Sequence, residues 1–113
     1  MKKILLIATG GTIASKYTEQ GLSPQISANE LLEYVPAARE FCTIDTEAPF
    51  SLDSTNVCAK HWVALAELIE KKYEYYDGFV ICHGTDTMAY TAAALSYLIQ
   101  NSPIIFPFFF CKI

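Results

Sequence analysis

Residues 4–12 read Ile4-Leu5-Leu6-Ile7-Ala8-Thr9-Gly10-Gly11-Thr12, an unbroken apolar run that leads directly into a glycine turn bearing two threonines. A second stretch has the same plan, because the apolar run Phe79-Val80-Ile81-Cys82 leads into His83-Gly84-Thr85-Asp86. Apolar runs without alternation are typical of parallel strands that are buried on both faces. Ligands of such sheets bind beyond the carboxyl ends of the strands, so we expect Thr12 and Thr85 to share one crevice.

The remaining segments predict helices that alternate with strands. A capping box at Ser27-Ala28-Asn29-Glu30 predicts a short helix that ends at Pro36. Further elements follow from apolar spacing and from β-branched residues: a strand within 41–50, a helix with the stripe Trp62, Leu65, Ile69 and Tyr73, and a helix from about 87 to 100. The polar stretch 15–25 is expected to be an extended loop that closes over a ligand. The alternation predicts an α/β fold, with a mostly parallel sheet, flanking helices and right-handed crossovers.

Length and composition exclude several classes of protein. The 113 residues suffice for one modest domain. A net charge of −4 with scattered lysines argues against binding of nucleic acid. The apolar segment 104–111 is too short to span a membrane, and we expect a cytoplasmic protein without a membrane segment. Cysteines at 42, 58, 82 and 111 show no ligand spacing, which favours reduced core thiols over disulfides or a metal site.

The two threonine turns suggest nucleophilic chemistry. A hydroxyl at Thr12, beside two glycines at a strand end, is open to attack a carbonyl if another group accepts its proton, and Thr85 is a candidate for that transfer. The alternative is that Thr12 only hydrogen-bonds within its turn. Asp86 stands where a carboxylate caps a helix, and the same carboxylate can bind a substrate ammonium group. The helix N-terminus beside it can bind a carboxylate, a combination that suits an amino acid.

Other polar residues have weaker assignments from the sequence. Ser54 and Thr55 follow the predicted strand within 41–50, so they lie on the same edge as the threonine turns and can bind a substrate carboxylate or serve as ordinary loop residues. His83 is more typical of a structural hydrogen-bonder than of a catalytic base. His61 has no partner that the sequence identifies, and we assign it no role.

Three stretches together resemble a known family, the bacterial L-asparaginases of the cytoplasmic type. The resemblance rests on residues 1–14 with Thr9-Gly10-Gly11-Thr12, on Leu52-Asp53-Ser54-Thr55-Asn56, and on residues 76–91 with His83-Gly84-Thr85-Asp86. Their order and spacing match the family from Met1 to about Ser102. The resemblance implies hydrolysis of L-asparagine to L-aspartate and ammonia, without metal or cofactor.

The resemblance also implies a role for each site residue. Thr12 would be the nucleophile and Thr85 would help to move its proton. The expected substrate-binding residues are Gly11, Ser54, Thr55, Gly84 and Asp86, with Asp86 on the α-ammonium group and Ser54 on the α-carboxylate. Relatives form homo-dimers or homo-tetramers.

The chain departs from the family in two places. The family's loop tyrosine aligns with Leu22, and the nearest tyrosine is Tyr17. The family's lysine that pairs with the residue matching Thr85 lies later than Ser102, and no residue here matches it. We therefore expect residues 1–102 to be the N-terminal part of the larger asparaginase domain and 103–113 to be a tail produced by a frameshift or truncation. The isolated chain is expected to be inactive.

Two other functions remain open at this point. The glycine turns of a small nucleotide-binding module would cradle phosphates, but such modules carry a GxGxxG or GxxxxGK[ST] pattern that opens a helix, and here a polar loop follows Thr12. A non-catalytic partner that joins full-length relatives in a mixed oligomer is the second alternative.

Overall fold

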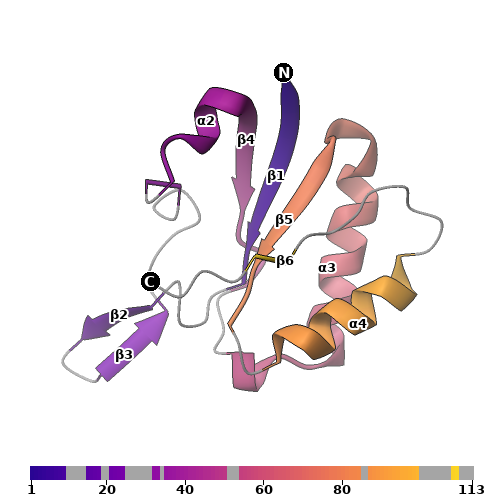
Figure 1. The fold of residues 1–113 in the computed structure, drawn as a ribbon. Coiled ribbons are helices and arrows are strands. Elements are labelled where there is room, and N and C mark those ends of the chain that lie inside the picture. Colours follow the sequence, from indigo (N-terminus) through magenta and orange to yellow (C-terminus); the bar gives the residue numbers. More distant parts are fainter. Residues whose placement is uncertain are drawn as a thin grey trace.

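The computed structural model describes residues 1–9, 15–18, 21–24, 32–33, 35–50, 54–84, 87–99 and 108–109. A parallel sheet of four strands lies at its centre, in the spatial order β4-β1-β5-β6. Figure 1 shows β1, β4 and β5 side by side and running in the same direction. The strands are β1 (Lys2–Ala8), β4 (Cys42–Glu47), β5 (Gly78–Cys82) and β6 (Phe108–Phe109), and the larger helices are α3 (Ala59–Lys72) and α4 (Met88–Leu98). The predicted α/β class and parallel sheet are confirmed.

Shorter elements surround the sheet. Helix α2 (Ala38–Phe41) leads into β4, and the single turns η2 (Ser54–Asn56) and η3 (Tyr73–Tyr75) flank α3. Strands β2 (Ser15–Thr18) and β3 (Gly21–Pro24) form an antiparallel hairpin. The expectation of an extended loop over 15–25 was therefore wrong for these eight residues, because backbone pairing across the turn is a property that polar composition does not reveal. The predicted capping box at 27–30 lies outside the described residues.

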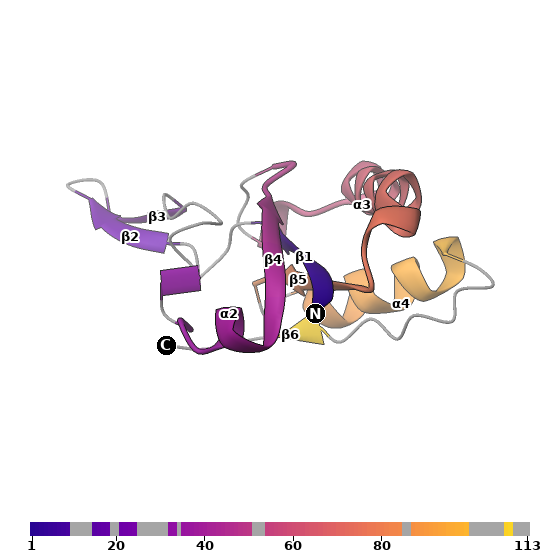
Figure 2. The same cartoon turned by 90° about the horizontal axis from the view of Figure 1, so that it is seen from above.

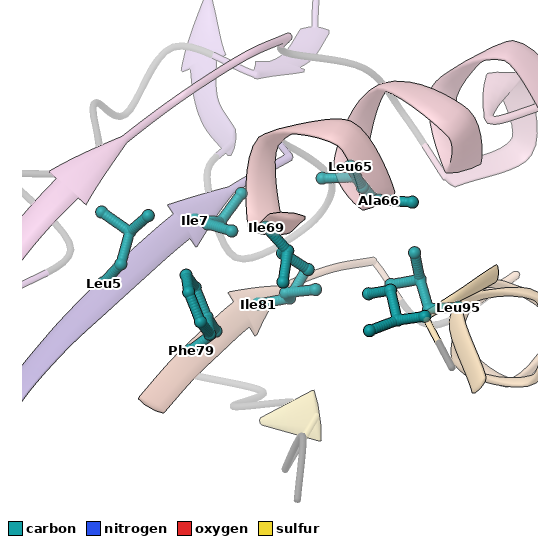
Figure 3. Close-up of a cluster of buried hydrophobic side chains, with 9 residues drawn as sticks. Leu5, Ile7, Leu65, Ala66, Ile69, Phe79, Ile81 and Leu95 are labelled. Carbon is teal, nitrogen blue, oxygen red and sulfur yellow. The ribbon is translucent and has the colours of Figure 1, made fainter. Parts of the chain in front are cut away.

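Both faces of the central strand β1 are buried over residues 5–8, as its unbroken apolar run predicts. Leu5 and Ile7 of β1 pack with Phe79 and Ile81 of β5 on one face, against α3 and α4 (Figure 3). The alternate residues of β1, Leu6 and Ala8, lie in a second cluster on the other face. Figure 2 shows α3 and α4 on one side of the strands and α2 on the other.

Helix α3 buries the apolar stripe from which it was predicted and exposes its polar residues. Leu65, Ala66 and Ile69 are buried against the sheet, and Trp62 is half-buried. Its polar residues Lys60, Glu67, Glu70 and Lys71 are exposed, as expected. The stripe therefore predicted both the helix and the face that it buries.

The C-terminal segment contributes a strand. Phe108 and Phe109 pair in parallel with Ile81 and Cys82 of β5. They follow Pro107 in the sequence. Proline has no amide donor, so it is better tolerated before a strand than in the middle of one. The division of the chain at 102 remains a prediction.

The described cysteines are free thiols with very different surroundings. Cys82 is buried in the second cluster, Cys42 is half-buried and Cys58 is exposed. The expectation of core thiols is therefore right for Cys82 and wrong for Cys58, which precedes α3 at the surface.

A polar cluster connects the starts of β1 and β5 with β4. The Tyr76 hydroxyl donates a hydrogen bond of 2.8 Å to Oδ2 of Asp45, and Nζ of Lys3 lies 3.5 Å from the same oxygen. This hydrogen bond lowers the pKa of the Asp45 carboxyl, with a smaller contribution from Lys3, and raises the pKa of the Tyr76 hydroxyl. Because the Asp45 pKa is lowered in the folded state, the stabilisation is present above the ordinary carboxyl pKa of about 4 and is lost as the pH falls through the folded value.

Replacing Tyr76 with phenylalanine is expected to raise the pKa of Asp45 toward its ordinary value, because the largest cause of the lowering is removed. The carboxyl carbon resonance of Asp45, followed during an acid titration, measures this change. Tyr75→Phe is the matched control, since Tyr75 is 68% exposed. An unchanged Asp45 pKa in the Tyr76→Phe protein, or an equal rise in the control, would contradict the assignment.

Candidate active site

The carboxyl ends of β1 and β5 are joined by hydrogen bonds at the residue that follows β1. The Thr9 amide donates to the Cys82 carbonyl at 3.1 Å, and the Thr9 hydroxyl donates to the same oxygen at 2.8 Å. Thr9 is 2% exposed, so these bonds are shielded from water. These hydrogen bonds hold together the starts of the two segments that carry the threonine turns, although Thr9 and Cys82 are 73 residues apart in the sequence.

Strand order makes this point the natural ligand crevice of the sheet. The chain passes from β1 to β4 in one direction and from β4 back across to β5 in the other, and then on to β6. The connections that leave β1 and β5 therefore diverge, and the carboxyl ends of such a strand pair form the crevice in which open α/β sheets bind ligands. In Figure 1 the arrowheads of β1 and β5 point to the end of the sheet where α3 and α4 begin.

The predicted site residues are described to different extents. Gly11, Thr12, Thr85 and Asp86 lie outside the described residues, and their assignments remain predictions. Gly84, two residues after β5, is buried. The backbone of Ser54 and Thr55 forms η2, in the connection that leaves the carboxyl end of β4, and the Thr55 side chain is exposed. The prediction that these two residues follow the carboxyl end of a strand is therefore confirmed, while their roles in binding remain predictions.

A buried polar network beneath the second turn was not identified from the sequence. Nε1 of Trp62 donates to the Thr91 hydroxyl at 2.9 Å, and the same hydroxyl lies 2.9 Å from Nε2 of His83. Nδ1 of His83 lies 2.7 Å from the Gly84 carbonyl oxygen. His83 is therefore a hydrogen-bonding residue, as expected, but Trp62 is more than a member of an apolar stripe. Its contact spans 29 residues, a distance that no local pattern reports.

His61 has a structural role at the start of α3. Its Nδ1 accepts a hydrogen bond of 3.0 Å from the Cys58 amide, and its ring lies 4.8 Å from the ring of Phe50, centroid to centroid. A capping box usually places glutamate or glutamine at this position. The sequence contains the spacing of a capping box, with His61 three residues after the cap residue Cys58, but this pair of residues is unusual for the motif.

The hairpin contains position 22, where the family resemblance implies a tyrosine and this chain has a leucine. Its register sets Tyr17 directly opposite Leu22. The nearest tyrosine of the chain is therefore adjacent in space to the position at which the family has its own.

A separate cavity lies away from this edge. It has a volume of about 450 Å³ and is lined by Lys3, Lys71, Lys72, Tyr75 and Tyr76. Lys3 lies at the start of β1, the two other lysines end α3, and the two tyrosines lie between α3 and β5. The cavity is therefore not part of the candidate active site.

The fold defines a class of protein, an α/β protein with a parallel sheet, and ligands of this class bind at the carboxyl ends of neighbouring strands. Residues 3–107 match the family model described as "Asparaginase, N-terminal", and the chain belongs to this family.

Two kinds of protein are similar to the chain in sequence. An L-asparaginase of Thermococcus kodakarensis is 44% identical over 103 residues, which are 90% of this chain and 31% of that protein. A subunit of the glutamyl-tRNA(Gln) amidotransferase of Metallosphaera sedula is 42% identical over 104 residues, which are 89% of this chain and 24% of that protein. The chain thus spans about a quarter to a third of the length of these relatives.

Solved structures of L-asparaginases are similar to the model. The thermostable L-asparaginase from Thermococcus kodakarensis superposes with a TM-score of 0.80 at 41% identity, covering 92% of this chain and 33% of that one. A probable cytoplasmic L-asparaginase from Campylobacter jejuni superposes with a TM-score of 0.76 at 37% identity, covering 84% and 31%. Among the described residues, no helix has the length and apolar character needed to cross a membrane.

Proposed function

We propose that this chain carries the nucleophile and the substrate-binding residues of an L-asparaginase active site. In this proposal the Thr12 hydroxyl oxygen attacks the side-chain amide carbon of L-asparagine, and Thr85 helps to transfer the hydroxyl proton. The carbon–nitrogen bond breaks, ammonia leaves with that proton, and an ester to Thr12 remains. Water then hydrolyses the ester, which yields L-aspartate and restores the threonine.

The remaining site residues bind the two charged groups of the amino acid. Asp86 binds the α-ammonium group, and Ser54 with Thr55 binds the α-carboxylate. Gly11 and Gly84 leave space for the substrate next to the backbone. The observation that supports this arrangement most directly is the pair of Thr9 hydrogen bonds to Cys82, because it holds together the ends of the two strands from which both threonine turns leave.

A hybrid enzyme provides the direct test. Residues 1–102 of this chain would replace the matching segment of the Thermococcus kodakarensis L-asparaginase, to which the chain is 44% identical. We expect this hybrid enzyme to release ammonia from L-asparagine. A folded hybrid enzyme that releases no ammonia from either L-asparagine or L-glutamine would contradict the proposal.

The 113-residue chain by itself is expected to release no ammonia above background. The relay lysine implied by the family resemblance has no counterpart in it, and one catalytic acid–base group typically contributes about 10²–10⁴-fold in rate. Purified chain assayed beside the hybrid enzyme tests this expectation. Turnover by the chain at the rate of the hybrid enzyme would contradict this expectation.

Transfer of the released ammonia is the second candidate function, favoured by the 42% identity to an amidotransferase subunit. The chemistry at Thr12 would be the same, but the ammonia would attack an activated carboxyl group on a partner, from which the activating group departs as the amide forms. Free ammonia release by the hybrid enzyme with L-asparagine alone favours hydrolysis, whereas a strong preference for L-glutamine favours transfer.

A further inference from the structure

Four polar groups from three elements form one continuous chain of hydrogen bonds. It runs from Nε1 of Trp62 on α3 to the hydroxyl of Thr91 on α4, then to the His83 imidazole after β5, and ends at the Gly84 carbonyl. Thr91 is 0% exposed and His83 is 1% exposed. Buried hydrogen bonds of this kind hold their members in one geometry, since water cannot substitute for a partner.

The identity of the end groups sets the direction of the two outer bonds. A carbonyl oxygen only accepts, so Nδ1 of His83 carries the hydrogen that it donates to Gly84. An indole nitrogen only donates, so the Thr91 oxygen accepts from Trp62. The Thr91 hydrogen is then free to point at Nε2 of His83, which accepts it. With this direction of the Thr91 bond, all four groups are satisfied by the imidazole that carries its hydrogen on Nδ1.

The end of this chain of bonds is next to the proposed chemistry. Gly84 directly precedes Thr85 and Asp86 in the sequence, and its carbonyl belongs to the peptide group that enters Thr85. We propose that His83 is a positioning residue of the active site, which holds the Gly84 carbonyl through Nδ1 and thereby orients the turn that carries Thr85. Thr91 and Trp62 act through His83 by selecting its tautomer. This inference rests on the proposed function for the roles of Thr85 and Asp86.

A purely structural role for His83 makes a different prediction. If the imidazole only satisfied the buried hydroxyl of Thr91, the contact at Nε2 would matter and the contact at Nδ1 would not. Asparagine and glutamine separate these two contacts, because the amide nitrogen of asparagine can donate from the place of Nδ1 and the amide oxygen of glutamine can accept at the place of Nε2. Both replacements are smaller than histidine and neutral, so each controls for the packing lost in the other.

Nuclear magnetic resonance of the full 113-residue chain tests the inference without any catalysis. In the unmodified chain we expect the hydrogen of His83 on Nδ1 and none on Nε2. His83→Asn should keep the Gly84 carbonyl and Thr85 amide resonances near their original positions, and His83→Gln should shift both. A hydrogen on Nε2 in the unmodified chain, or any other ranking of the two variants, would overturn the inference.

Thr91→Val decides the matter if neither His83 variant folds. Valine has nearly the shape of threonine but no hydroxyl, so Nε2 of His83 loses its donor. The inference expects a mixture of His83 tautomers and a shifted Thr85 amide resonance in this variant. An unchanged tautomer together with an unchanged Thr85 resonance would overturn it.

The hybrid enzyme extends the test to the reaction. A small displacement of catalytic groups can cost about 10²-fold in rate. We therefore expect His83→Gln to lower kcat by about 10²-fold with little change in KM, and His83→Asn to retain most of kcat. If the hybrid enzyme itself is inactive, the proposed function fails while the resonance measurements still decide the role of His83. Equal kcat values for an active pair would overturn the positioning role.

Discussion

Thr12→Val in the hybrid enzyme is expected to lower ammonia release from L-asparagine by more than about 10³-fold, because it removes the nucleophile. Valine keeps the branched shape of threonine, so the loss would come from the hydroxyl and not from packing. Thr12→Ser keeps a hydroxyl and should retain part of the activity. The measurement is the initial rate of ammonia formation at saturating substrate.

Two companion variants make the Thr12 result specific. Thr85→Val should also cause a large loss, since Thr85 is proposed to move the proton. Thr43→Val is the matched control, because Thr43 is an exposed residue of β4 whose hydroxyl lies 3.6 Å from the sulfur of the exposed Met1. Near-normal turnover by the Thr12→Val enzyme would overturn the nucleophile assignment, and a comparable loss in the Thr43→Val enzyme would show that the effect is not specific.

Phe79→Ala is expected to destabilise the folded chain by about 3–5 kcal/mol. Phe79 is 1% exposed in the cluster that joins β1, β5, α3 and α4 (Figure 3). Its ring lies 5.9 Å from that of Tyr76, centroid to centroid. Removal of the ring leaves a cavity at the centre of that cluster. Since domains of this size are stable by only roughly 5–15 kcal/mol, the variant should be largely unfolded or close to it.

Phe41→Ala makes the same chemical change at a surface position and serves as the control. Phe41 is 76% exposed, so its loss should change the free energy of unfolding by about 0.5 kcal/mol or less. Unfolding in urea, followed by circular dichroism, compares the two variants with the unmodified chain. Equal midpoints for Phe79→Ala and the unmodified chain would mean that this cluster is not the core.

Local patterns were sufficient for the elements that carry their own signal. The unbroken apolar residues of β1 and β5 indicated strands covered on both faces, and the stripe through Leu65 and Ile69 indicated the buried face of α3. These predictions succeeded because burial acts on residues that are close in sequence and repeat with the period of the strand or helix. The edge of the sheet on which Ser54 and Thr55 lie could be predicted for the same reason, since a parallel strand determines which end its loop leaves.

Some local features were missed because their residues are unusual for the role. The hairpin of β2 and β3 lies in a polar stretch without an alternating apolar face, so its backbone pairing had no signature in composition. His61 caps α3 from a position where glutamate is the common residue. The hairpin depends on backbone pairing, and the cap depends on a side-chain acceptor that residues other than glutamate can supply.

The sequence by itself determined the α/β class, the asparaginase-family resemblance and the two threonine turns that follow β1 and β5. Only the tertiary structure decided that β1 and β5 are neighbours, joined at Thr9 and Cys82, and that Trp62, Thr91 and His83 are linked by buried hydrogen bonds. The physical reason is that strand order and buried hydrogen bonds form between residues 8 to 73 positions apart. Such contacts form only when the two helices and the sheet pack together, and no periodic pattern along the chain records them.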